Sequence, residues 1–375
     1  MIEIVPVANP RLPTVHDVLP YLREIDRTRQ YANHGPLVRR FEARLAQRFG
    51  APSDDLVALV SSGTAALAAI FAALEIAPGA LCMIPSWTFA ATAHAALTAG
   101  LVPWLVDVDP ADGVLTPERA LALVPSAPGP LGAIVTVSPF GLPFTTEGWA
   151  AFRERTGIPV VIDAAAAFDS VRESSIPTAV SLHATKALGV GEGGVVLWND
   201  RSGIRAVRER TNFGFAGRRE AMSAATNAKP SEYTAAVGLA ALDQWPATRA
   251  DFQRVAAQYR RALGERADVA FQRGYGERWI SSTVIVQLAP GMLRRVEGAL
   301  QERGIETRRW WASGLAKQPA FRRFPRTLLP VTENLAETTI GLPCARDLAS
   351  STIETIAEIV IQAVTGAKRP RAHSA

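Results

Sequence analysis

The chain has 375 residues, 48% of them hydrophobic, which predicts a large buried core in one large domain and a smaller second one. No apolar run approaches the length of a membrane span and the N-terminus lacks a signal-peptide pattern, so we expect a cytoplasmic protein without a membrane partner. The net charge of +5 comes from basic residues mixed with acidic ones, and the two cysteines lack metal-ligand spacing, so neither a nucleic-acid partner nor a bound metal is expected.

The first predicted elements are two helices. Residues 14–29 have a helical pattern that begins at Thr14. Pro36 suits the first turn of a second helix, which places its apolar residues on one face and ends at Gly50. Both helices are therefore expected to pack against the core.

A predicted strand at residues 56–60 leads into the sequence SSGTAAL and an alanine-rich helix. A turn of small residues at a helix N-terminus leaves backbone amides unpaired, and the helix dipole favours an anion there. We therefore expect Ser62, Gly63 and Thr64 to bind a phosphate group. The alternative is that this turn is an ordinary helix N-cap.

Strands alternate with helices over the next hundred residues, which is typical of a mostly parallel sheet. The predicted elements are strands at 81–84, 102–108 and 132–137, a helix that follows Phe89, and a helix at 117–123. A further strongly apolar strand, residues 158–163, ends at Asp163. The carboxyl ends of such strands are where ligands bind, so Asp163 is a candidate site residue, with a capping role as the alternative.

One lysine stands in the stretch SLHATKALGVGEGG, between an apolar run and a glycine-rich turn that leads into a second apolar run, residues 195–198. Burial penalises the charged ammonium, so Lys186 is a candidate nucleophile for Schiff-base chemistry, although most lysines are only surface charges. Gly189, Gly191 and Gly194 match the dinucleotide pattern G-x-G-x-x-G. That pattern should open a helix, and here it precedes a strand, so we discard it.

The C-terminal part of the chain is predicted to form the smaller domain. We place the boundary between residues 1–247 and 248–375. The large domain is predicted to end with a helix at 200–211 and an irregular segment at 212–230, and the smaller domain to contain a long helix at 248–266, strands at 281–288 and 305–309, and a helix at 350–364.

The stretch around Lys186 resembles the cofactor-lysine segment of the DegT/DnrJ/StrS aminotransferases. SGTAAL, TNAKPSEYTAAVGLAALD and GIETRRWWASGL resemble further segments of that family, and the likeness extends over roughly residues 33–345. The resemblance implies an α/β protein of the fold type I pyridoxal-phosphate transferases, in which a mostly parallel seven-stranded sheet lies between helices beside a smaller α/β domain. It implies pyridoxal 5′-phosphate as the cofactor, bound to Lys186.

The resemblance also assigns roles to other residues. It makes SGT the phosphate-binding turn, stacks Phe89 on the pyridine ring, and pairs Asp163 with the ring nitrogen. Ser181 is a further cofactor-binding residue. Asn227 matches an asparagine that reaches the cofactor phosphate of the neighbouring subunit, which implies a homodimer with shared active sites. The alternative for Phe89 is an ordinary core phenylalanine.

The chain departs from the family pattern at three places. Ala166 stands where the family commonly has Gln or His, and the residues before the turn at Phe140 and Gly141 lack a usual histidine. Trp310 and Trp311 keep the aromatic character of a segment usually rich in tyrosine. These two rings either face a nucleotide or pack between the domains.

The implied activity is transfer of an amino group from an amino acid, by analogy glutamate, to a keto-deoxysugar carried on a nucleotide, at carbon C3 or C4. Lys186 would move protons as general acid and base. Arg218, Arg219 and Lys229 are candidates for contacts with the substrate diphosphate. The expected process is amino-sugar biosynthesis, such as that of lipopolysaccharide O-antigen. The alternatives are a sugar dehydratase, in which relatives replace the lysine by histidine, and a catalytically degenerate or regulatory homologue.

Overall fold

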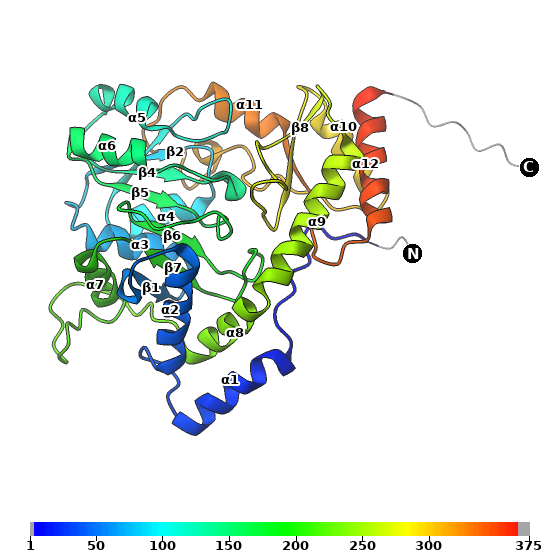
Figure 1. The fold of residues 1–375 in the computed structure, drawn as a ribbon. Coiled ribbons are helices and arrows are strands. Elements are labelled where there is room, and N and C mark those ends of the chain that lie inside the picture. The colour runs from blue at the N-terminus through cyan, green and yellow to red at the C-terminus, as the bar shows by residue number, and fades with distance from the viewer. Residues whose placement is uncertain (1–3, 367–375) are drawn as a thin grey trace, which may run out of the picture.

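The structure of the protein, a computed structural model, describes residues 4–366. These residues form two sheets and the helices that cover them (Figure 1). The helices are α1 (Val15–Thr28), α2 (Pro36–Phe49), α3 (Gly63–Ala73), α4 (Ala90–Thr98), α5 (Pro117–Leu123), α6 (Glu147–Thr156), α7 (Arg201–Arg210), α8 (Glu232–Asp243), α9 (Trp245–Leu263), α10 (Leu293–Gln301), α11 (Pro330–Thr338) and α12 (Ser350–Thr365). The strands are β1 (Val57–Val60), β2 (Leu81–Pro85), β3 (Val102–Val106), β4 (Leu131–Val137), β5 (Val160–Asp163), β6 (Thr178–Ser181), β7 (Gly194–Leu197), β8 (Val269–Phe271), β9 (Val284–Leu288) and β10 (Thr339–Leu342).

The larger sheet has seven strands in the order β1-β7-β6-β5-β4-β2-β3. β7 runs antiparallel to both of its neighbours, and the other pairs are parallel. The predicted mostly parallel, seven-stranded sheet is therefore confirmed. No helix among residues 4–366 has the length and apolar character needed to cross a membrane.

Helices cover both faces of this sheet, because its strands are apolar on both sides. Successive residues of a strand point to opposite faces, and in β1 Val57 and Leu59 belong to one buried cluster while Ala58 and Val60 belong to the other. The first cluster includes side chains of α2, α5 and α6, and the second includes side chains of α3, α4 and α7. The carboxyl ends of the parallel strands are left free to build a site.

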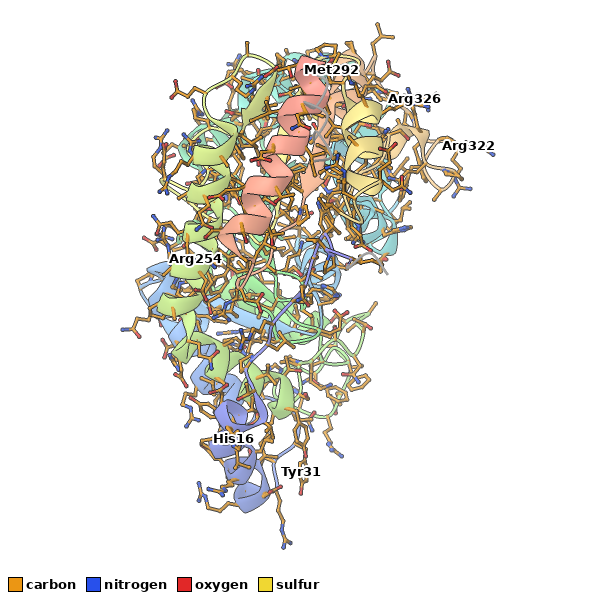
Figure 2. The ribbon with its side chains drawn as sticks, turned by 90° about the vertical axis from the view of Figure 1, so that its right-hand side faces the viewer. His16, Tyr31, Arg254, Met292, Arg322 and Arg326 are labelled. Carbon is orange, nitrogen blue, oxygen red and sulfur yellow. The ribbon has the colours of Figure 1, made fainter. Side chains whose placement is uncertain are left out.

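The smaller sheet is antiparallel, in the order β10-β9-β8, and α9 leads from the larger sheet toward it (Figure 1). Viewed from the side, His16 and Tyr31 lie at one end of the molecule and Met292 and Arg322 at the other, with Arg254 on α9 between them (Figure 2). The N-terminal segment also joins this part, because Val5 and Ala8 bridge to later segments of the chain.

The predicted strand at residues 305–309 is wrong. Ile305 forms a single bridge to Val5, and Arg308 forms a single bridge to Gly341. The segment pairs with two different partners one residue at a time, so no continuous ladder develops. Its sequence, IETRR, also offers only one apolar residue to bury.

Candidate active site

Asp163 ends β5 at the carboxyl edge of the sheet, and only 5% of its surface is exposed. Its Oδ2 accepts a hydrogen bond of 2.7 Å from the hydroxyl of Thr92, and its Oδ1 accepts one of 3.1 Å from the backbone N–H of Ala165. The Thr92 hydroxyl lies 2.9 Å from that of Thr88. Sequence reasoning missed Thr92, although its position in the first turn of α4, three residues after Phe89, placed it near the same edge.

Lys186 and Asp163 act on each other electrostatically. Burial raises the pKa of Asp163, and this rise is opposed by the bonds from Thr92 and Ala165 and by the charge of Lys186. Burial lowers the pKa of Lys186, and the charge of Asp163 opposes that change. Burial therefore favours the neutral amine that a Schiff-base lysine needs, as the sequence predicted.

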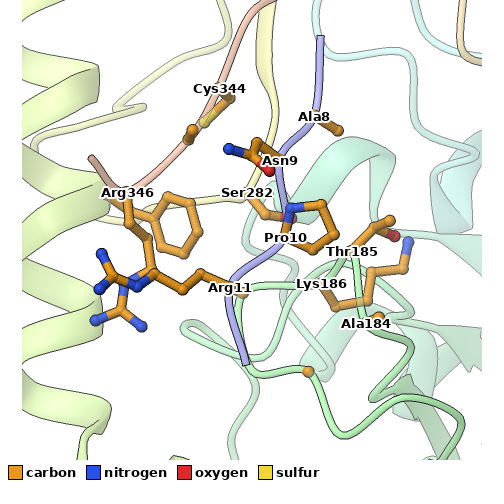
Figure 3. A pocket seen from close by; sticks show the side chains of 14 residues that line it. Ala8, Asn9, Pro10, Arg11, Ala184, Thr185, Lys186, Ser282, Cys344 and Arg346 are labelled. Atoms are coloured by element: carbon orange, nitrogen blue, oxygen red, sulfur yellow. The ribbon is translucent and has the colours of Figure 1, made fainter. Parts of the chain in front are cut away.

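The lysine sits in the loop between β6 and β7, where its backbone N–H donates to the carbonyl oxygen of His183 at 2.8 Å. The cavity beside it is lined by three separate parts of the chain (Figure 3). These are the N-terminal residues 8–11, the loop that contains Lys186, and the C-terminal part, which contributes Phe252, Ser282 and residues 344–346. Arg11 and Arg346 point away from the Lys186 amine in Figure 3.

The turn before α3 has both of the features considered from its sequence. The Ser62 hydroxyl caps the helix by accepting from the backbone N–H of Ala65 at 3.1 Å, so the N-cap interpretation is correct. The backbone amides of Gly63 and Thr64 have no acceptor among residues 4–366, so they remain available to an anion.

Glycines bring this turn close to the strands that flank Lys186. A Cβ on Gly63 would lie 2.8 Å from the Cβ of Ser181, at the end of β6. A Cβ on Gly194, the first residue of β7, would lie 2.2 Å from the carbonyl oxygen of Ser62. Gly194, at the end of the glycine-rich stretch after Lys186, therefore allows β7 to pack closely on the turn at residues 61–64, called the anion turn below.

Phe89 is the N-cap residue of α4, and 60% of its surface is exposed, so the core interpretation of this ring is wrong. Asn227 is also exposed, and its Oδ1 accepts from Lys229 Nζ at 2.7 Å. The next residue, Ala228, accepts from the backbone N–H of Ser61 at 2.8 Å. Asn227 thus lies beside the anion turn of its own chain, and its reach toward a second subunit stays a prediction.

Of the two open interpretations for the tryptophan pair, packing holds for Trp311. This ring is 8% exposed, stacks on Phe140 with centroids 4.1 Å apart, and meets Trp87 edge-on at 5.1 Å. Phe140 and Trp87 come from the large sheet's loops, so Trp311 joins the two parts of the chain. The indole N–H of Trp310 is buried without a hydrogen-bond partner among the described residues.

The arrangement of a buried lysine, a buried carboxylate and an open anion turn can be compared with known proteins. The sequence model of the DegT/DnrJ/EryC1/StrS aminotransferase family matches residues 14–361. The chain belongs to this family.

Protein Rv3402c of Mycobacterium tuberculosis is 27% identical over 96% of this chain and 90% of its own length. A UDP-2-acetamido-2-deoxy-3-oxo-D-glucuronate aminotransferase of Pseudomonas aeruginosa is 29% identical over 95% of this chain and 98% of its own.

A solved structure, that of DesI in the presence of its TDP-sugar product, superimposes on this aminotransferase with a TM-score of 0.86. The two are 28% identical, and the match covers 98% of this chain and 94% of DesI. The fold type I architecture predicted from the sequence is confirmed by this match.

The residues of the site fit pyridoxal phosphate, the cofactor of this family. Asp163 offers a buried carboxylate to a protonated ring nitrogen, and Lys186 offers an amine to the aldehyde. The unpaired amides of Gly63 and Thr64 offer donors to the phosphate. The ring nitrogen, the aldehyde and the phosphate of the cofactor thus each have a partner of suitable chemistry at one edge of the sheet.

Proposed function

We propose that this aminotransferase moves an amino group from an amino acid, with glutamate as the expected donor, to a keto-deoxysugar carried on a nucleotide. The observation that carries the proposal is the buried carboxylate of Asp163, which Thr92 and Ala165 hold at 2.7 Å and 3.1 Å at the edge of the sheet where its charge acts on Lys186. The nucleotide-sugar names of the Pseudomonas relative and of the DesI ligand support the substrate class. Retention of Lys186 supports amino transfer over dehydration.

Different residues of the chain have different roles in this reaction. When bound, pyridoxal phosphate supplies an electron sink for the bond that breaks at the donor Cα. Lys186 Nζ would take the proton from the donor Cα and later give it back, which requires the neutral amine that burial favours. Asp163 holds a proton on the ring nitrogen, and the Thr92 hydroxyl orients that carboxylate. The amides of Gly63 and Thr64, with Ser62 and Ser181, orient the phosphate.

We expect glutamate to change the visible absorption spectrum of the holoenzyme. The band of the cofactor bound to Lys186 should be replaced by that of its amino form, with release of 2-oxoglutarate, because the first half-reaction needs no sugar. Spectra before and after glutamate, with coupled measurement of 2-oxoglutarate, check this. A stable band that no amino acid alters would overturn the proposed transamination, whereas a response to another amino acid would change only the donor.

We further propose that the active enzyme is a cytoplasmic homodimer. Large aromatic side chains are exposed on the segment 213–233 and next to it: Tyr31 is 49% exposed and stacks on Tyr233, which is 48% exposed. Phe213, which is 47% exposed, lies under the ammonium of Lys229 at 4.2 Å. A second copy that covers this surface would remove it from water and bring its own Asn227 to the site.

Mixed dimers of two inactive variants test this arrangement. If Asn227 serves the partner's site, Asn227→Ala and Lys186→Ala subunits pair to give one intact site per mixed dimer. The mixed dimer, with one intact site of two, should therefore show about half of wild-type activity. Coexpression with two different tags and assay of the purified mixed dimer measures it. Activity no greater than that of either variant alone would place Asn227 in its own chain's site.

A further inference from the structure

A cleft of about 760 Å³ lies apart from the catalytic lysine. It shares no lining residue with the cavity beside Lys186. Its walls come from α2, from the loop 142–145, from residues 169–172, from α9, and from the turn at 273–279. The size is that of pockets that hold small molecules. Neither the proposed reaction nor the cofactor uses any of these residues.

Arginines dominate this cleft, and they surround one buried carboxylate. Asp169 is 5% exposed, and its side chain accepts from Arg249 Nε at 2.8 Å, from Arg48 at 3.4 Å and from the backbone N–H of Ile280 at 3.1 Å. The carboxylate is therefore already occupied by donors. It holds Arg48 and Arg249 in place and has little capacity left to neutralise further charge.

Two of the guanidinium groups are held close to each other. Arg48 donates to the backbone carbonyl oxygen of Asp169 at 2.8 Å, and Arg172 donates to the same oxygen at 3.1 Å. Burial, together with the positive charges of Arg172 and Arg249, lowers the pKa of Arg48. Like charges this close repel one another, and an anion between them would relieve that repulsion.

The arginine side chains that line the cleft outnumber the carboxylates that could neutralise them. Arg278 and Arg172 have no carboxylate within ion-pair distance among residues 4–366, whereas Arg273 at the rim pairs with Asp112 at 3.0 Å. With Arg273 paired, the cleft holds four guanidinium groups, those of Arg48, Arg172, Arg249 and Arg278, against one carboxylate. Four positive charges less one negative charge leave an excess of three.

We propose that this cleft binds a diphosphate group, either free or carried on a nucleoside. A diphosphate carries about three negative charges near neutral pH, and the forked guanidinium donors suit its oxygens. An extended nucleic acid would need a basic stripe, whereas Asp112 and Glu277 carry negative charge next to the arginines at the rim. The apolar floor of Phe144 and Trp279 limits water and strengthens the charge interactions.

Calorimetric titration of the holoenzyme with inorganic pyrophosphate, and separately with UDP, tests the proposal. The informative variant is Arg172→Gln/Arg278→Gln, because both side chains are exposed and Arg278 makes no hydrogen bond within the described part of the chain. Arg322→Gln is the matched control, since Arg322 projects from the surface (Figure 2) and does not line the cleft. Arg278→Gln alone serves if the double variant folds poorly.

We expect wild-type enzyme to bind pyrophosphate with a Kd below about 1 mM, the double variant to bind at least about tenfold more weakly, and Arg322→Gln to match wild type. UDP that binds more tightly than pyrophosphate, with the same loss in the double variant, would identify the nucleoside form as the ligand. Absence of binding up to about 10 mM, or equal affinity in wild type and the double variant, would overturn the proposal.

Discussion

Replacement of Lys186 by alanine is expected to abolish transamination, with a loss in kcat of about 10⁴-fold or more. The variant loses both the amine that bonds the cofactor and the group that moves the proton from the donor Cα. The half-reaction with glutamate, followed by absorbance in a stopped-flow instrument, measures the loss directly.

The control for this variant is Lys317→Ala. Lys317 is exposed, pairs with Glu333 at 3.1 Å and does not line the cavity, so its removal should leave the rate within about twofold of wild type. A Lys186→Ala enzyme with more than about 1% of wild-type kcat would contradict the assignment.

Local signals were enough to predict most of the larger sheet and to select Lys186 and Asp163 as candidate site residues. Lys186 and Asp163 could be selected because each stands at the end of a strongly apolar run, where only a ligand or a partner offsets the cost of burial. The end of α2 at Gly50 could also be predicted. Its φ of 74° is left-handed backbone, which favours glycine.

The missed features depend on contacts between distant segments. Glu232 is fully buried and accepts from the backbone N–H groups of Leu37 at 2.8 Å and Val38 at 3.0 Å, so α8 caps α2 across nearly two hundred residues. In the sequence it is one acidic residue at the start of a helix. The arginine cleft was missed for the same reason. Its members are scattered from α2 to the turn at 273–279, and only the fold gathers them.

Replacement of Asp163 by asparagine is expected to lower activity and raise stability together. The neutral side chain keeps the shape, and its two ends can still bond: Oδ1 accepts from Ala165, and Nδ2 donates to a Thr92 hydroxyl that turns toward Thr88. It cannot hold a proton on the cofactor ring, so kcat should fall by about 10²–10³-fold. Steady-state kinetics on the fully loaded enzyme measure this loss.

The stability gain should depend on pH in a way that identifies its cause. Burial raises the pKa of Asp163 above its ordinary 3.8, so the folded apoenzyme binds this proton more tightly than the unfolded chain does. That contribution to the stability of the folded apoenzyme is present below pH 3.8. It is lost as the pH rises through the pKa that Asp163 has in the folded protein. The apoenzyme of Asp163→Asn should therefore unfold at a higher temperature than wild type near neutral pH, with the gap closing below about pH 4.

Thr92→Val separates the two effects of this carboxylate. The variant removes the hydroxyl that lowers the pKa of Asp163 and leaves Lys186 and Ala165 as the groups that oppose the effect of burial. It should reduce kcat by only about tenfold and should destabilise the apoenzyme, because a buried acceptor loses its donor. If Asp163→Asn instead lost stability at neutral pH while Thr92→Val did not, the carboxylate would be a structural cap, and its assignment to the cofactor nitrogen would be wrong.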